Sequence, residues 1–176
     1  MLSILQLIVD TIATLLGGVL LLRFWMQATR VRPPQSVAQF TYTVTDWLVR
    51  PLRRVVPGVG GYDWASLIGA FLIVMLGTSV YLLAGLPVET VFLHAIHRFL
   101  TWILYGFMAL LIIEAIFSWV NPQAPLAPLV SALNDPLLRP LRRLVPTLGG
   151  LDLSMLVAFI VLRIVMYLVD TTIPHF

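Results

Sequence analysis

The chain has 176 residues, of which 60% are hydrophobic and only 11% are charged, and its mean hydropathy is +0.97. Soluble domains usually carry about a quarter charged residues, so this composition excludes an ordinary water-soluble globule and favours a membrane protein. The net charge is +3, and the absence of cysteine excludes disulfides, thiolate metal sites and cysteine nucleophiles within this chain.

Four apolar runs follow one another along the chain, at residues 4–26, 64–86, 99–120 and 153–169. About 20 helical residues cross a hydrocarbon core of ~30 Å, so each run is long enough to span a bilayer. The first run has no basic start and no obvious cleavage site, which favours a mature span over a signal peptide. The sequence therefore predicts an all-α membrane protein with four transmembrane helices.

Each pair of spans is separated by an amphipathic segment, residues 36–57 and 125–146, in which apolar residues recur every three or four positions. Residues 46–63 (DWLVRPLRRVVPGVGGYD) and 135–152 (DPLLRPLRRLVPTLGGLD) are identical at twelve of eighteen positions, at an offset of 89. We therefore predict two tandem copies, residues 1–88 and 89–176. Because each copy crosses the membrane twice, the repeat is parallel.

The arginines predict the orientation in the membrane. The two loops between the paired spans hold eight of them, whereas the opposite side has only Arg98 at its edge. By the positive-inside rule, both loops are cytoplasmic and both termini lie outside the cytoplasm.

Two hydrophobic helices that flank P-L-R-R-x-x-P-x-x-G-G-x-D resemble the YggT/YlmG family of bacterial membrane proteins, and this chain carries the motif twice. The resemblance implies a location in the bacterial inner membrane. Family members have been associated with cell-division gene neighbourhoods and with osmotic or cation stress, and plastid relatives with cytochrome-complex assembly, haem attachment and nucleoid organisation. This favours an assembly factor over an enzyme.

One position departs from the family pattern Arg-x-x-x-Ser-Trp. Glu114 replaces the arginine before Ser118-Trp119, whereas Arg23 is kept in the first copy.

The motif residues have distinct predicted roles. Pro51 and Pro140 should break or kink the amphipathic helices. Asp63 and Asp152 should cap the spans that follow them. Six arginines should face anionic lipid headgroups or a partner protein, although they could instead only set topology: Arg50, Arg53, Arg54, Arg139, Arg142 and Arg143.

Charges inside the spans need partners. We predict that Glu114 pairs with Arg23 or with Arg163, which lies near the bilayer midplane, and Asp10 is a second acid that could meet Arg163. Such a pair would lock the bundle or, alternatively, line a path for ions or protons.

His94 and His97 are spaced i,i+3, so a metal or haem ligand pair is conceivable, but solvated interfacial residues explain them equally simply. We predict no catalytic, cofactor or metal residues, since no phosphate loop, nucleophile elbow, zinc motif or nucleic-acid module is visible.

The sequence as a whole predicts a non-enzymatic organising or assembly factor of the inner membrane. Its Arg-rich cytoplasmic loops would act on anionic lipid headgroups and on partner membrane proteins or further copies of itself, with no nucleic acid directly indicated. The alternative is an oligomeric channel or ion-permeation component.

Overall fold

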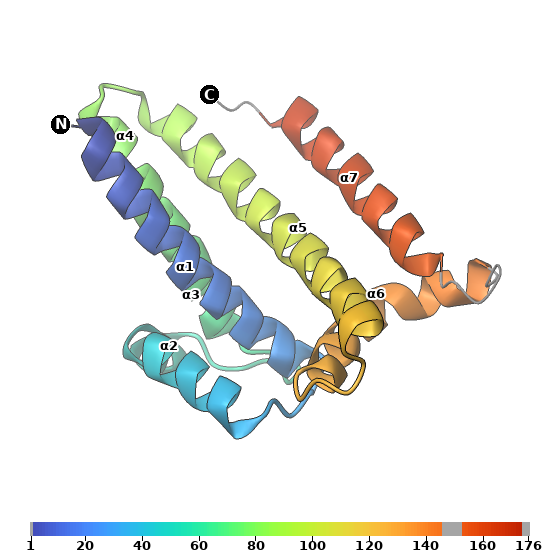
Figure 1. Cartoon of the computed structure of the whole chain (residues 1–176). Coiled ribbons are helices and arrows are strands. Elements are labelled where there is room, and N and C mark those ends of the chain that lie inside the picture. Colours follow the sequence, from blue (N-terminus) through green and yellow to red (C-terminus); the bar gives the residue numbers. More distant parts are fainter. Residues whose placement is uncertain (1, 146–152, 174–176) are drawn as a thin grey trace.

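The computed structural model describes residues 2–145 and 153–173, which are almost entirely helical (Figure 1). In chain order the helices are α1 (Leu2–Ala28), α2 (Gln35–Val55), α3 (Trp64–Thr78), α4 (Val80–Leu83), α5 (Val88–Val120), α6 (Ala127–Leu144) and α7 (Ser154–Thr172).

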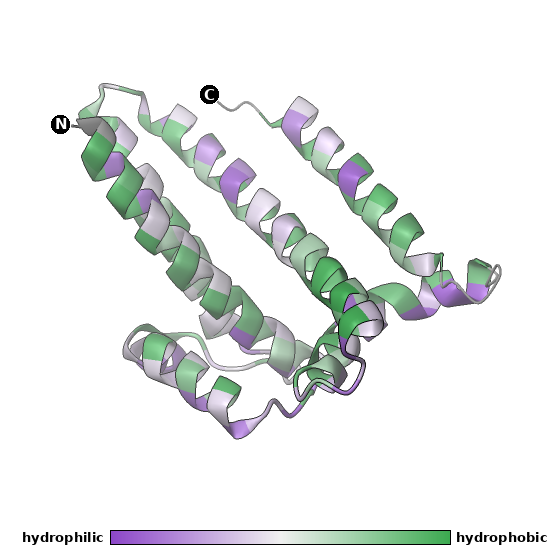
Figure 2. Cartoon of the chain, viewed as in Figure 1, coloured by the Kyte–Doolittle hydropathy of each residue, from purple (hydrophilic) through white to green (hydrophobic). Residues whose placement is uncertain are grey.

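Four helical segments are long and apolar enough to cross a membrane, and they correspond to the four predicted spans. They are α1, the run Trp64–Leu83 formed by α3 and α4, α5 and α7. Figure 2 shows that hydrophobic residues, coloured green, recur along these helices. The predicted all-α fold with four transmembrane helices is therefore confirmed.

The largest difference from prediction is the start of α5. It begins at Val88, eleven residues before the predicted run 99–120. Charged and histidine residues interrupt the apolar run there, but they do not prevent a helix. Val91 and Ala95, four residues apart, are both buried, and this apolar stripe holds the first turns of α5 in the bundle.

The amphipathic helices α2 and α6 lie across the same end of the spans, while both termini lie at the other end (Figure 1). α2 continues through Pro51, and α6 continues through Pro136 and Pro140. Of the two predicted effects of Pro51 and Pro140, a helix break is therefore wrong, and a kink stays a prediction. A proline costs the helix a hydrogen bond. The fully buried Val49 and Leu138, each two residues before a proline, hold these helices against the spans.

Within each repeat, the spans pack in pairs, α1 against α3 and α5 against α7. An apolar cluster also joins the two repeats, in which Met26 of α1 packs with Leu129 and Leu133 of α6. Trp25 of α1 also donates a hydrogen bond from Nε1 to the Leu133 carbonyl, at 2.9 Å. The second amphipathic helix therefore rests partly on the first repeat.

α1 approaches α5 at a glycine. A Cβ atom added to Gly17 would lie 2.1 Å from Cζ3 of Trp102, so no larger residue fits without moving the indole ring. The next residue, Gly18, has open space around its Cα. The close approach of α1 to α5 therefore depends on Gly17 and not on Gly18.

Candidate functional site

Arg23, near the end of α1, is buried in a polar cluster beside α2. Its side chain is 5% exposed. Nη1 donates hydrogen bonds to Thr45 Oγ1 at 2.6 Å and to Asp46 Oδ1 at 2.7 Å. The guanidinium carbon also lies 4.8 Å from the centre of the Tyr42 ring, in a cation–π contact. The amphipathic helix thus supplies the groups that neutralise and solvate a cation of the span.

Asp63 extends the same cluster to the start of α3. Arg53 donates to both of its carboxylate oxygens, from Nε at 3.1 Å and from Nη2 at 2.6 Å. Ser66 Oγ donates to Oδ2 at 2.6 Å, and Arg23 Nε lies 3.5 Å from the same oxygen. Asp63 therefore links α1, α2 and α3. We call Arg23, Thr45, Asp46, Arg53, Asp63 and Ser66 the first polar cluster.

Asp63 occupies the predicted position before α3, and its carbonyl accepts from the Ser66 amide at 3.0 Å. The predicted cap is nevertheless wrong in its chemistry, because the carboxylate forms no hydrogen bond with the helix amides. The guanidinium groups of Arg23 and Arg53 compete with the helix amides for the Asp63 carboxylate. Hydrogen bonds between two charged groups are stronger than those from a neutral amide. Asp152, the equivalent residue of the second copy, lies outside the described residues.

The arginines also shift the acidity of the cluster. The hydrogen bond from Arg23, with the charges of Arg23 and Arg50, holds the pKa of Asp46 below its usual value of 3.8. Burial alone would raise the pKa of Asp63, but the bonds from Arg53 and Ser66 and both arginine charges lower it overall. Asp63 in turn raises the pKa of Arg53. The cluster therefore holds carboxylates and guanidinium groups in their charged forms.

The second repeat has a matching cluster around Glu114, which is 8% exposed. Asn134 Nδ2 donates to Glu114 Oε2 at 2.6 Å and to the Leu110 carbonyl at 2.9 Å. Arg142 Nη2 lies 3.7 Å from Glu114 Oε1. We call Glu114, Asn134 and Arg142 the second polar cluster.

The two clusters are related by the repeat. Asn134 stands 89 residues after Thr45, and Arg142 stands 89 residues after Arg53. The spanning residue that meets them carries opposite charges in the two copies, since Arg23 is a cation and Glu114 an anion.

The predicted pairing of Glu114 with Arg23 or Arg163 is therefore wrong. Arg23 and Glu114 each find partners on the amphipathic helix of their own repeat. Asp10 accepts from Arg98 Nη1 at 2.6 Å instead of meeting Arg163. Arg163 is exposed on α7, and no ion pair within the described part of the chain includes it.

Two further pairs lie toward the end of the molecule that carries the termini. His97 Nε2 lies 2.8 Å from Asp170 Oδ1, and the next residue of α5, Arg98, holds Asp10. Adjacent residues of α5 thus contact α7 and α1. The ring of His94 packs on Tyr81, with centroids 5.4 Å apart. Across residues 2–145 and 153–173, no three side chains gather that could hold a metal ion.

The sequence model of the CCB3/YggT family matches residues 1–84 and 93–173 of this chain. The chain belongs to this family. It is 39% identical to an uncharacterized protein of Pseudomonas aeruginosa over 170 residues, which cover 92% of this chain and 86% of the relative. It is 34% identical to the uncharacterized protein YggT of Escherichia coli K12 over 169 residues, which cover 90% and 85%. No solved structure matches.

The six arginines of the two YggT-type loops fall into three kinds. Arg50 and Arg139 form ion pairs with the aspartate four residues before them on the same helix. Arg53 and Arg142 reach back to the carboxylates of the two polar clusters. Arg54 and Arg143 are exposed, and neither forms an ion pair with a described residue.

Proposed function

We propose that this YggT-family membrane protein is a non-catalytic organising or assembly factor. It holds a partner helix beside its spans and contacts headgroups through α2 and α6. The observation that carries this proposal is the exposed Arg163 in the middle of α7.

Arg163 lies nine residues from each end of α7, about 13 Å from either end of the helix. It is exposed between the apolar residues Ile160 and Tyr167, which are 48% and 67% exposed. A charge at the centre of a bilayer costs about 2.5–3.5 kcal/mol even on the most permissive scales. α7 packs mainly against α5 and α6, so this face is open to a neighbouring helix. A carboxylate on that helix would offset the cost.

The headgroup contact is supported by α2 and α6, which lie together at one end of the spans. α2 exposes the aromatic residues Phe40 and Trp47, each 60% exposed, and the unpaired Arg54. Aromatic and basic side chains on one amphipathic helix suit the boundary between headgroups and acyl chains. By the positive-inside rule, this end faces the cytoplasm of a bacterial inner membrane.

Site-directed crosslinking in membranes tests the partner contact, and the natural absence of cysteine makes single-cysteine variants straightforward. Ile160→Cys lies on the Arg163 side of α7, whereas Val161→Cys lies about 200° from Arg163 and serves as the control. We expect a discrete adduct from position 160 only, which Arg163→Leu abolishes. An adduct of twice the chain mass identifies a second copy as the partner. Equal crosslinking from both faces, or adducts unaffected by Arg163→Leu, would contradict the proposal.

A second candidate, an oligomeric channel or ion-permeation component, has one observation in its favour. Asp10, Arg98, His97 and Asp170 place four ionisable side chains within the spanning helices. If they line a path, purified protein in liposomes should conduct ions, and Asp10→Asn should change the flux. Absence of flux, together with Arg163-dependent crosslinking, would favour the assembly factor.

A further inference from the structure

We propose that a cleft beside the first polar cluster binds the phosphate group of an anionic membrane phospholipid. The cleft has a volume of about 290 Å³ and lies between the end of α1, the segment that follows it, and α2. Arg23, Arg30, Gln27 and Tyr42 line it, together with Gly61 of the turn before α3. This site deepens the headgroup contact of the proposed function but does not depend on the partner contact at Arg163.

Arg23 brings unused donors to the cleft. A guanidinium group carries five N–H donors, and among the described residues only Nη1 of Arg23 forms hydrogen bonds. Nε forms no hydrogen bond, although Asp63 Oδ2 lies 3.5 Å from it. A guanidinium group with unused donors forms strong charge-assisted hydrogen bonds, so a phosphate oxygen that reaches it would be favoured.

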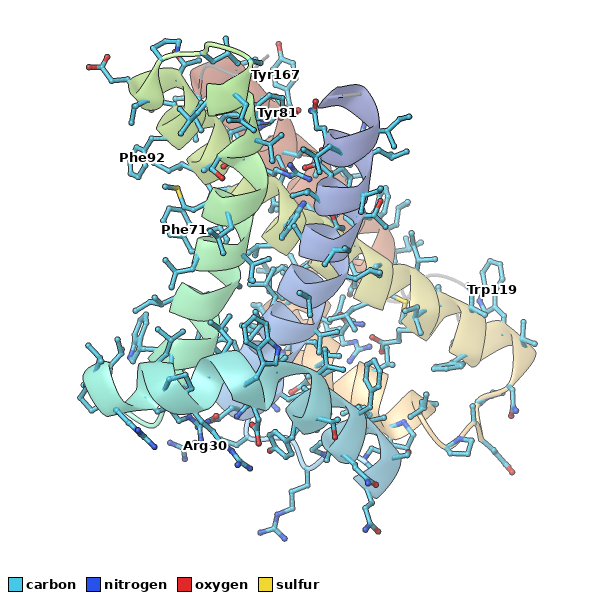
Figure 3. All side chains as sticks on the ribbon, turned by 90° about the vertical axis from the view of Figure 1, so that its left-hand side faces the viewer. Arg30, Phe71, Tyr81, Phe92, Trp119 and Tyr167 are labelled. Atoms are coloured by element: carbon cyan, nitrogen blue, oxygen red, sulfur yellow. The ribbon has the colours of Figure 1, made fainter. Side chains whose placement is uncertain are left out.

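Arg30, which also lines the cleft, has an unusual backbone conformation. Its φ is +55°, and it is the one non-glycine residue with positive φ in the described part of the chain. Such conformations are strained and tend to be retained at functional positions. Its Nη2 lies 3.9 Å from the point where a Cβ on Gly61 would stand, and Gly61 itself has φ +82°. Figure 3 shows Arg30 at the end of the molecule where α2 lies.

The first repeat has an excess of positive charge between the end of α1 and the start of α3. Residues 23–63 contain six arginines and two aspartates: Arg23, Arg30, Arg32, Arg50, Arg53 and Arg54, and Asp46 and Asp63. The aspartates are engaged by Arg23, Arg50 and Arg53, whereas Arg30, which lines the cleft, forms no ion pair with a described residue.

The position in the bilayer indicates which anion. The cleft lies at the end of α1, where the apolar span Ile4–Ala28 ends, and Met26 and Val31 add apolar walls. Because the ends of transmembrane spans lie at the level of the lipid headgroups, we infer that lipid phosphates reach the cleft. The phosphodiester of a phospholipid has two oxygens that can accept a pair of hydrogen bonds from one guanidinium group. The glycerol and acyl carbons of the same lipid suit the apolar walls.

The second repeat lacks this cationic lining. Glu114, an anion, stands where the first repeat has Arg23, and the position 89 residues after Tyr42 is Ser131. We therefore assign the phosphate site to the first repeat, and arginines of α6 provide matched controls.

The test is binding of dioleoyl-phosphatidylglycerol to the purified full chain in detergent, followed by native mass spectrometry and by the shift in thermal midpoint. We expect saturable binding that Arg30→Gln weakens at least tenfold. Arg30→Lys, which keeps the charge but loses the fork, should weaken it by a smaller factor. Arg143→Gln, which removes an equal charge from α6, should change it less than twofold.

Three outcomes would overturn the proposal. Equal losses from Arg30→Gln and Arg143→Gln would mean non-specific attraction. Equal affinity for dioleoyl-phosphatidylcholine would mean that the cleft does not select anionic lipid. Inorganic phosphate that binds as tightly as the lipid would make the free ion the ligand. A partner adduct at position 160 can persist in each of these cases, so failure of this site and failure of the proposed function are distinguishable.

Discussion

Asp63 joins three helices of the first repeat through a single carboxylate. Its side chain is 2% exposed, and its ion-pair partners come from α1 and α2. A buried ion pair adds little compared with apolar packing, but the loss of one member leaves the others as uncompensated buried charges. Asp63 is therefore important mainly because its removal would leave Arg23 and Arg53 with uncompensated charge.

Asp63→Asn keeps the size of the side chain but removes its charge. We expect the free energy of unfolding to fall by about 3–5 kcal/mol, because the buried Arg23 loses one of its two carboxylate partners among the described residues and Arg53 loses the carboxylate with which it pairs. Unfolding of the purified protein in detergent measures the change. The control is Asp135→Asn, which breaks an exposed pair with Arg139 and should cost less than about 1 kcal/mol. Similar small losses in both variants would show that the Asp63 ion pairs are not structural.

The lowered pKa values of Asp46 and Asp63 predict an acid-sensitive fold. A carboxyl group with a lower pKa in the folded state adds stability that is fully present above its unfolded value of 3.8. That stability is lost as the pH falls through the lowered folded value. Thermal midpoints measured from pH 6 downward should therefore drop below about pH 4. The drop should be shallower in Asp63→Asn, and an unchanged pH profile would refute the assignment.

Within the helix α1, the two neighbouring glycines have different surroundings. Gly17 faces Trp102 of α5, and Gly18 faces open space. The ring of Trp102 in turn packs against the guanidinium of Arg98, 5.3 Å from its centre, so displacing it disturbs a second contact. The close approach of α1 and α5 therefore depends on one small residue.

Gly17→Ala should destabilise the protein by about 1–3 kcal/mol, because the added methyl group forces the indole ring to move. Gly18→Ala should be neutral or stabilising by up to about 1 kcal/mol, since alanine is the better helix former. The same detergent unfolding experiment compares the two variants. Equal effects would indicate that α1 and α5 do not pack closely at this point.

Hydropathy alone was enough to predict the helices whose length and composition are determined by the bilayer. The spans were predictable because a lipid environment demands long apolar helices. The continuation of α2 through Pro51 was not, because it depends on burial of Val49 against other helices. The start of α5 at Val88 was missed because charged residues shortened the apolar run.

The polar clusters were only partly predictable. The sequence identified Arg23, Glu114 and the motif arginines, but not which of them meet, since that depends on where α2 and α6 cross the spans. The repeat offered a usable indication, because Asn134 stands 89 residues after Thr45, and Glu114 replaces the arginine of the family pattern. Asp170 was overlooked because it follows the fourth apolar run.

For the whole molecule, the side of the membrane on which α2 and α6 lie stays a prediction from arginine placement. A membrane-impermeant maleimide on intact cells tests it with single-cysteine variants. We expect Glu89→Cys, in the first turn of α5, to react, and Arg54→Cys on α2 to react only after the membrane is permeabilised. Both sites are exposed, so accessibility within the protein does not differ. The reverse pattern would place the Arg-rich loops outside the cytoplasm.

α5 and α7 pack side by side but differ greatly in length. α5 has 33 residues and α7 has 19, which correspond to about 50 Å and about 28 Å. A hydrocarbon core of about 30 Å matches α7, whereas α5 must tilt, protrude or thicken the surrounding lipid. α5 and α7 thus present helices of unequal length to the surrounding lipid. We expect the tilt of the protein to respond to acyl-chain length.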